Sequence, residues 1–201
     1  MHFIVALTGA SGQGYALRLL HKLAATDARI SLILSEAACM TLAEEHDIKV
    51  TPHAPDLAKL FAGQVPENVT VYSPRAIGAP IASGSQPHDG MVIVPCSMTT
   101  LSRVAHGLAQ DLISRAADVT LKERRKLILV TREMPLSLIH LKNMTAATEA
   151  GATVFHACPH FYHRPQTVEE VLDTVVDRIL DHLGVESDTK RWKEKDEAGN
   201  E

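Results

Sequence analysis

The stretch that decides the fold is Phe3-Ile4-Val5-Ala6-Leu7, followed directly by the turn Thr8-Gly9-Ala10-Ser11-Gly12. An unbroken apolar run of this length is typical of a strand that is buried on both faces of a parallel sheet. The turn leads into an amphipathic segment, residues 12–25, which we expect to be a helix. Strand, glycine-containing turn and helix in this order form the first unit of an α/β fold.

The same alternation continues to residue 183. We expect further strands at residues 30–34, 69–72, 91–95, 127–130 and 153–155. Further helices are expected at residues 36–45, 57–61, 98–122 with a break near Gly107, 137–150 and 168–183. Apolar strands that alternate with helices predict a Rossmann-like, flavodoxin-like three-layer sandwich with a mainly parallel sheet.

Length and composition narrow the class of protein. The 201 residues fit one domain, which we place at residues 1–186, followed by a mixed-charge tail at residues 187–201. A net charge of -4 argues against nucleic-acid binding by bulk electrostatics. The three cysteines form no CxxC pair, and neither a signal peptide nor a long apolar segment is evident. We therefore expect a reduced, cytoplasmic protein that binds neither nucleic acid nor membranes.

Ligands in open parallel sheets bind beyond the carboxyl ends of the strands. The turn at residues 8–12 offers glycines, the hydroxyl of Ser11 and a helix N-terminus, all of which suit a phosphate. The alternative is a tight turn in which Ser11 only caps the helix. The glycine spacing is not the GxGxxG of dinucleotide-binding folds. Ser35, at the end of the second strand, suits a phosphate oxygen better than Glu36 suits a ribose hydroxyl.

Two later strand ends also carry polar side chains. Ser97-Met98-Thr99-Thr100 places three hydroxyls at a helix start, where they can cap the helix, bind a ligand or do both. Arg132-Glu133 follows the strand at residues 127–130 and is either part of a site or a surface ion pair.

Three other features have competing interpretations. Arg115 and Lys122 lie seven residues apart and share a helix face, so they can hold an anion together or belong to a solvated surface. The histidines and the cysteine of residues 156–163 contain metal-binding side chains, but not in a standard ligand spacing. Cys96 is favoured as a small buried residue over a nucleophile.

Taken in order, these motifs resemble those of the UbiX-type flavin prenyltransferases, and the resemblance runs from Phe3 to Leu183. The segments that carry it are Thr8-Gly9-Ala10-Ser11-Gly12, Ala82-Ser83-Gly84-Ser85, Gly90-Met91-Val92-Ile93-Val94-Pro95-Cys96-Ser97, Arg115-Ala116-Ala117-Asp118-Val119, Leu121-Lys122-Glu123-Arg124-Arg125, Arg132-Glu133, Pro135-Leu136, Ile139-His140-Leu141 and Phe161-Tyr162.

The resemblance implies a reaction that joins the dimethylallyl group of dimethylallyl phosphate to N5 and then C6 of reduced FMN, without a metal. It implies a homo-oligomer, typically a dodecamer with active sites between subunits, whose product serves a UbiD-type decarboxylase. The residues implied to hold FMN are Gly9, Ala10, Ser11, Ser35, Ser97, Met98, Thr99, Thr100 and Arg132. Those implied to hold dimethylallyl phosphate are Arg115, Lys122, Tyr162 and Arg178, and the carboxylates implied near the chemistry are Glu45 and Glu133. Lys122 is also counted with the catalytic residues.

The sequence departs from the family pattern at a few positions: Gln86, Met134, and Gly14 with Ala16. None of these removes a polar group from the implied site. Two rival functions remain: an FMN-dependent cysteine decarboxylase of the phosphopantothenoylcysteine type, and a non-catalytic flavin carrier or decarboxylase subunit. The first rival lacks its Met-Asn pair here, and the second has no need of Arg115, Lys122, Glu133 and Arg178.

Overall fold

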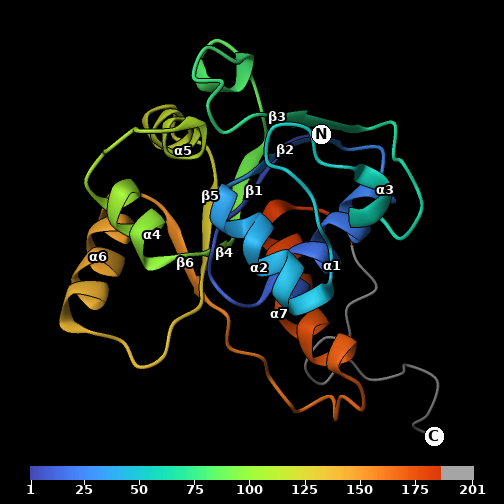
Figure 1. The fold of residues 1–201 in the computed structure, drawn as a ribbon. Helices are drawn as coiled ribbons and strands as arrows, with labels where there is room; N and C mark the ends of the chain where they lie inside the picture. The colour runs from blue at the N-terminus through green and yellow to red at the C-terminus, as the bar shows by residue number, and fades with distance from the viewer. Residues whose placement is uncertain (187–201) are drawn as a thin grey trace, which may run out of the picture.

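The computed structural model describes residues 1–186; the predicted tail at residues 187–201 lies outside the described residues. Figure 1 shows a central sheet with helices on both sides. The strands are β1 (His2–Leu7), β2 (Arg29–Leu34), β3 (Val69–Tyr72), β4 (Gly90–Cys96), β5 (Leu127–Thr131) and β6 (Thr153–His156). The helices are α1 (Gln13–Ala24), α2 (Glu36–His46), α3 (Leu57–Leu60), α4 (Met98–Ala105), α5 (Leu112–Lys122), α6 (Leu138–Glu149) and α7 (Val168–Leu183), with a short 3-10 helix, η1 (Pro80–Ala82).

The sheet is parallel throughout, in the order β3-β2-β1-β4-β5-β6. The chain moves outward from β1 through β2 to β3, returns to the other side of β1, and then moves outward again through β4, β5 and β6. The direction therefore reverses between β1 and β4. In an open sheet of this kind, such a reversal point opens a crevice at the carboxyl ends of the two strands.

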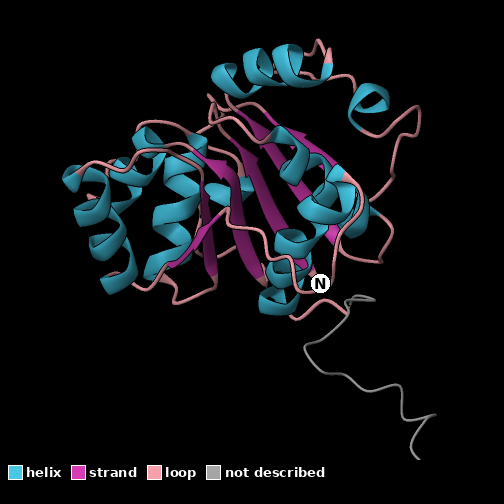
Figure 2. Ribbon diagram, turned by 90° about the horizontal axis from the view of Figure 1, so that it is seen from below, coloured by secondary structure: helices cyan, strands magenta, loops and turns pink. Residues whose placement is uncertain are grey.

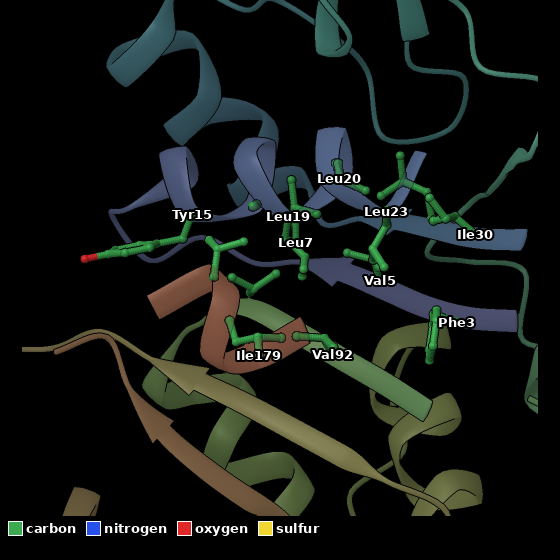
Figure 3. Close-up of a cluster of buried hydrophobic side chains, with 14 of the residues drawn as sticks. Phe3, Val5, Leu7, Tyr15, Leu19, Leu20, Leu23, Ile30, Val92 and Ile179 are labelled. Carbon is green, nitrogen blue, oxygen red and sulfur yellow. The ribbon is translucent and has the colours of Figure 1, made fainter. Parts of the chain in front are cut away.

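Alternate residues of each strand point to opposite faces and form two separate cores. On one face, Val5, Leu32 and Val92 pack with α1, α2 and α7. On the other, Ala6 and Ile93 pack with α4, α5 and α6. Figure 2 shows the sheet between the two helix layers, and Figure 3 shows the first core, in which side chains of α1 lie over β1 and near Ile179 of α7. The predicted three-layer α/β fold is confirmed.

The structure refines two predicted elements. The expected helix at residues 98–122 is two helices, because Gly107 takes a positive φ of 65° and the side chain of Asp111 begins α5 by accepting a hydrogen bond from the amide of Ser114. The mainly parallel sheet is entirely parallel over the described part of the chain. No helix within residues 1–186 is long and apolar enough to cross a membrane.

Candidate functional site at the carboxyl edge of the sheet

The turn between β1 and α1 is shaped by two glycines. Gly12 takes a φ of 106°, a left-handed conformation that favours glycine. A Cβ atom at Gly9 would lie 2.4 Å from the Cβ of Ala37, so this glycine lets the turn approach the start of α2. The turn before α1 is therefore in close contact with the start of α2 and is not a loose loop.

A carboxylate from α2, and not Ser11, caps helix α1. The two carboxylate oxygens of Glu45 accept hydrogen bonds from the backbone amide of Gly12, at 2.9 and 3.1 Å, and from that of Gln13, at 2.8 Å. A negative charge at this end is favourable because it satisfies free amides and opposes the positive end of the helix dipole. The alternative in which Ser11 caps α1 is therefore wrong, since Gly12, which has no side chain, occupies the capping position.

The hydroxyl of Thr8 ties this turn to the turn that follows β4. It donates a hydrogen bond to the carbonyl of Pro95 at 2.7 Å and accepts one from the amide of Ser97 at 2.8 Å. Thr8 is buried, with 2% of its surface exposed, so both hydrogen bonds are shielded from water. The two turns on either side of the reversal point are thus held in a fixed relation.

The two predicted serines begin helices, as capping requires. Ser35 accepts a hydrogen bond from the amide of Ala38 at 3.0 Å, and Ser97 accepts one from that of Thr100 at 3.2 Å. Met98, Thr99 and Thr100 form the first turn of α4. A capping hydroxyl uses a lone pair, so its hydrogen can still donate to a ligand. Capping and ligand binding are therefore compatible here.

Arg132 connects the end of β5 to the turn between β1 and α1. Its Nε atom donates a hydrogen bond to the carbonyl of Ser11 at 3.0 Å. Glu133 instead accepts a hydrogen bond from the amide of Met134 at 3.1 Å. Within residues 1–186 no ion pair joins Arg132 to Glu133, so the alternative of a surface ion pair between them is wrong.

Polar groups therefore follow four adjacent strands: Ser35 after β2, residues 9–11 after β1, Ser97 to Thr100 after β4, and Arg132 after β5. Hydroxyls, backbone amides and one guanidinium at a single edge suit a phosphate and the polar edge of an aromatic ring. These residues fit a flavin mononucleotide. The predicted flavin-binding residues, although scattered over the sequence, are brought to one edge.

Two predicted cations lie together on α5. The Nε atom of Arg115 donates to the carbonyl of Ala82 at 3.3 Å, and its Nη1 atom lies 2.9 Å from a carboxylate oxygen of Asp118. Lys122 pairs with Glu123, and its Nζ atom would lie 2.8 Å from a Cβ at Gly84. Both cations thus border the segment at residues 82–84, which supports the prediction that they share a site.

Arg178 lies on the other side of the sheet, and Tyr162 lies in the loop between β6 and α7. Arg178 belongs to α7, which packs with α1, whereas α5 packs on the opposite face. Tyr162 precedes α7 and stacks on His160, with ring centroids 4.0 Å apart. Arg115, Lys122, Arg178 and Tyr162 therefore do not form one cluster within a single chain. Helix periodicity shows which residues share a helix face, but not which face of the sheet each helix covers.

The remaining alternatives concern cysteines and histidines. Burial raises the pKa of the Cys96 thiol to about 12, so the side chain is uncharged at neutral pH, as expected of a buried residue and not of a nucleophile. Cys39, Cys96 and Cys158 are all free thiols. No three metal-binding side chains of the described residues are grouped as a metal site, and His160 and His163 instead contact Tyr162.

Sequence reasoning missed two buried polar residues beneath the site. The sequence places Thr8 in the turn but indicates no role for its hydroxyl, and nothing in it marks Gln13 as a site residue. Gln13 is fully buried, and its side-chain amide donates hydrogen bonds to the carbonyls of Thr8 and Ala10. A glutamine between two glycines gives no sequence signal of burial, because this residue type is usually exposed.

Comparison with known proteins places the chain among flavoproteins. A family model described as Flavoprotein matches residues 1–180. A flavin prenyltransferase UbiX of Archaeoglobus fulgidus is 46% identical, with 96% of this chain and 100% of that protein covered. The mitochondrial flavin prenyltransferase PAD1 of Saccharomyces cerevisiae is 44% identical, with 94% and 74% covered.

Solved structures give the same picture. AnUbiX (PadA1) in complex with FMN and dimethylallyl pyrophosphate has a TM-score of 0.85 and 39% identity, covering 96% of this chain and 97% of that one. A dodecameric FMN-dependent UbiX-like decarboxylase from Escherichia coli O157:H7 has a TM-score of 0.83 and 39% identity, covering 96% and 100%. A phosphopantothenoylcysteine-type (PPC) decarboxylase, the rival considered above, has a TM-score of 0.59 at only 16% identity, which is a likeness of fold alone.

Proposed function

The chain belongs to the flavoprotein family and, within it, to the UbiX-type flavin prenyltransferases, and we propose that it transfers a dimethylallyl group from dimethylallyl phosphate to reduced FMN. The carbon–oxygen bond of the donor breaks and inorganic phosphate leaves. The allylic carbon would bond to N5 of the flavin, which loses its proton. The remaining carbon–carbon double bond would then take up a proton and bond to C6 through its tertiary carbon, and C6 would lose its proton. The product is a prenylated FMN for a UbiD-type decarboxylase.

The observation that carries this proposal is the meeting of the turns after β1, β4 and β5. Thr8 joins the turn after β1 to the turn after β4, and Arg132 joins the turn after β5 to the turn after β1. Gly9, Ala10, Ser11, Ser35, Ser97 to Thr100, and Arg132 would hold FMN there. Such donors are already in place before the ligand arrives, so binding does not require them to be ordered first.

The donor phosphate needs a separate set of cations. An allylic phosphate ionises only when the departing negative charge is stabilised, and Arg115, Lys122 and Arg178 can do so through charge-assisted hydrogen bonds. Tyr162 would add a hydroxyl. Since guanidinium and ammonium groups supply this stabilisation, the proposed reaction needs no metal.

Two carboxylates would act near the reacting atoms. Glu133 would take the proton lost from the flavin ring, because its carboxylate lies directly after Arg132 at the end of β5 and is not ion-paired to it. Glu45 belongs to α2, and its carboxylate lies against the start of α1, where it would place a negative charge beside the flavin-binding turn. That charge would stabilise the positive charge that develops on the dimethylallyl group.

A homo-oligomer with shared active sites would unite the cations that one chain separates. Arg115 and Lys122 of one subunit would then face Arg178 and Tyr162 of another. The chain also exposes large apolar side chains near the start of α6 and before α7, with Met134, Ile139 and Phe161 exposed by 85%, 69% and 63%. Apolar groups of this size on a surface are typical of subunit contacts. We propose a dodecamer, by analogy with the E. coli relative, and a cytoplasmic location, which suits three free thiols.

The test is an anaerobic incubation of the protein with reduced FMN and dimethylallyl phosphate, followed by mass spectrometry of the flavin. We expect a flavin that has gained one five-carbon unit, and the same result in the presence of EDTA. Arg115→Gln serves as a matched variant that should bind FMN but form little adduct. Bound FMN without any adduct, from either the monophosphate or the pyrophosphate donor, would instead favour the non-catalytic flavin carrier.

A further inference from the structure

Gln13 is the first residue of α1, and its side chain turns back beneath the β1–α1 turn. None of its surface is exposed. The side-chain Nε2 atom donates hydrogen bonds to the carbonyl of Thr8 at 2.8 Å and to that of Ala10 at 3.0 Å. Because both partners are acceptors, only the NH2 end of the amide can face them. The backbone amide of Gln13 is held as well, by Glu45.

These two hydrogen bonds fix the orientation of two peptide groups. In a planar trans peptide, the C=O of one residue and the N–H of the next point in opposite directions. The carbonyls of Thr8 and Ala10 point inward to Gln13, so the amides of Gly9 and Ser11 point away from it. Neither amide finds an acceptor among residues 1–186, although most backbone amides in folded proteins are paired.

We propose that Gln13 is a positioning residue for the flavin: its side chain holds the amides of Gly9 and Ser11 in the orientation that binds FMN. The inference rests on the proposed FMN binding, but not on prenyl transfer. The effect extends to the second turn, since the hydroxyl of Thr8 also binds the backbone around Ser97. One buried amide would therefore order both turns beside the reversal point.

A purely structural role for Gln13 explains the geometry less well. Its Oε1 atom is buried and has no hydrogen-bond partner within the described chain. A buried, unpaired acceptor destabilises the fold, and an apolar side chain of the same size would avoid that cost. What an apolar residue cannot supply is the pair of donors to Thr8 and Ala10. These two donors fix the orientation of the turn at which FMN would bind.

The test compares Gln13→Met with Asn68→Leu. Methionine has a similar size but no donor, so the turn is free to reorient. Asn68 provides a matched control, because its side-chain amide binds the carbonyls of Ala24, Thr26 and Ala28 at the other end of α1, at 3.3, 3.0 and 2.9 Å. For Gln13→Met we expect the Kd for FMN, followed by quenching of flavin fluorescence, to rise about tenfold, the scale of one lost orienting interaction. The KM for FMN should rise in parallel, with kcat at saturating FMN and the KM for dimethylallyl phosphate unchanged.

Asn68→Leu should lower the melting temperature and leave the Kd for FMN unchanged. A third variant, Gln13→Glu, measured near pH 5.5, keeps one donor as a protonated carboxyl, because burial raises the pKa of a carboxyl. Its Kd should lie between those of the wild type and Gln13→Met, and it replaces Gln13→Met if that variant does not fold.

The outcomes separate two failures. If the wild type binds FMN and Gln13→Met binds it equally well, or if Asn68→Leu weakens binding as much as Gln13→Met does, Gln13 is not a positioning residue. If the wild type itself does not bind FMN, the proposed function fails and this inference fails with it.

Discussion

Mixed oligomers of two inactive variants test whether the active site is shared between subunits. Arg115 lies on α5, and Arg178 lies on α7 across the sheet. If a site takes its α5 cations from one subunit and its α7 cation from another, Arg115→Ala and Arg178→Ala damage different partners of the same site. We therefore expect both variants to be inactive alone and to restore activity when they are combined in one oligomer.

The geometry also sets the magnitude. In randomly mixed oligomers at a 1:1 ratio, half of the subunits keep Arg115 on α5 and the other half keep Arg178 on α7. A site that takes α5 from one subunit and α7 from another therefore has both arginines in about a quarter of cases. Two differently tagged variants would be co-expressed, purified through both tags and assayed for prenylated FMN by mass spectrometry. We expect about a quarter of the wild-type rate per site. A rate no higher than that of either variant alone would refute the shared site and place both cations in one chain's site.

Three further variants test individual groups. Burial lowers the pKa of His88 to about 4, so as the pH falls below 6.5 this histidine is protonated in the unfolded chain before it is protonated in the folded one. The free energy of unfolding should therefore decrease by up to about 3 kcal/mol between pH 7 and 4. In denaturant titrations, His88→Gln should make the free energy of unfolding less dependent on pH. Cys96→Ala should keep its activity and lower the melting temperature by about 2–4 °C, which corresponds to about 1 kcal/mol of stability in a chain of this size. A large loss of activity in a folded variant would mean that the thiol takes part in the reaction. Glu45→Gln should lower the stability about as much as Cys96→Ala, because it weakens the cap of α1. It should also slow prenyl transfer at least tenfold, which corresponds to about 1.4 kcal/mol in the activation free energy. An unchanged rate would mean that Glu45 only caps α1.

Local patterns in the sequence predict most of the fold. The apolar runs of β1, β4 and β5 are uninterrupted, and that of β2 is interrupted only by the buried Ser31, because both faces of these strands are buried. The helices repeat apolar residues toward one face. That the proposed flavin-binding residues lie at one edge of the sheet could be predicted for a related reason. Each follows a strand, and the carboxyl ends of parallel strands meet at one edge. Strand prediction alone therefore brings Ser11, Ser35, Ser97 and Arg132 together.

Interactions between distant segments could not be predicted in this way. Glu45 reaches the amides of Gly12 and Gln13 only because α2 crosses the start of α1, and no local pattern encodes that approach. The face that each helix covers has a partial rule. The helix α1 connects β1 to β2, and α5 connects β4 to β5; these two connections run in opposite directions along the sheet. Because both crossovers are right-handed, the two helices cover opposite faces of the sheet. Within residues 1–186 no strand follows α7, so no crossover fixes the face that α7 covers, and the sequence alone does not place Arg178.

The two sets of proposed binding residues therefore depend on assembly to different degrees. The proposed flavin-binding turns are held within one chain by Thr8, Gln13 and Arg132, so we expect FMN to bind without a partner. The cations proposed to bind the donor phosphate are divided between two faces of the sheet, so we expect a complete donor site to require a second copy. A surface change that separates the subunits without unfolding them, for example a charged residue at the exposed Ile139, should abolish prenyl transfer and preserve FMN binding. Gel filtration, flavin fluorescence and adduct formation measured on the same sample would reveal that separation. Simultaneous loss of FMN binding in a folded monomer would show that the flavin site, too, is built between chains.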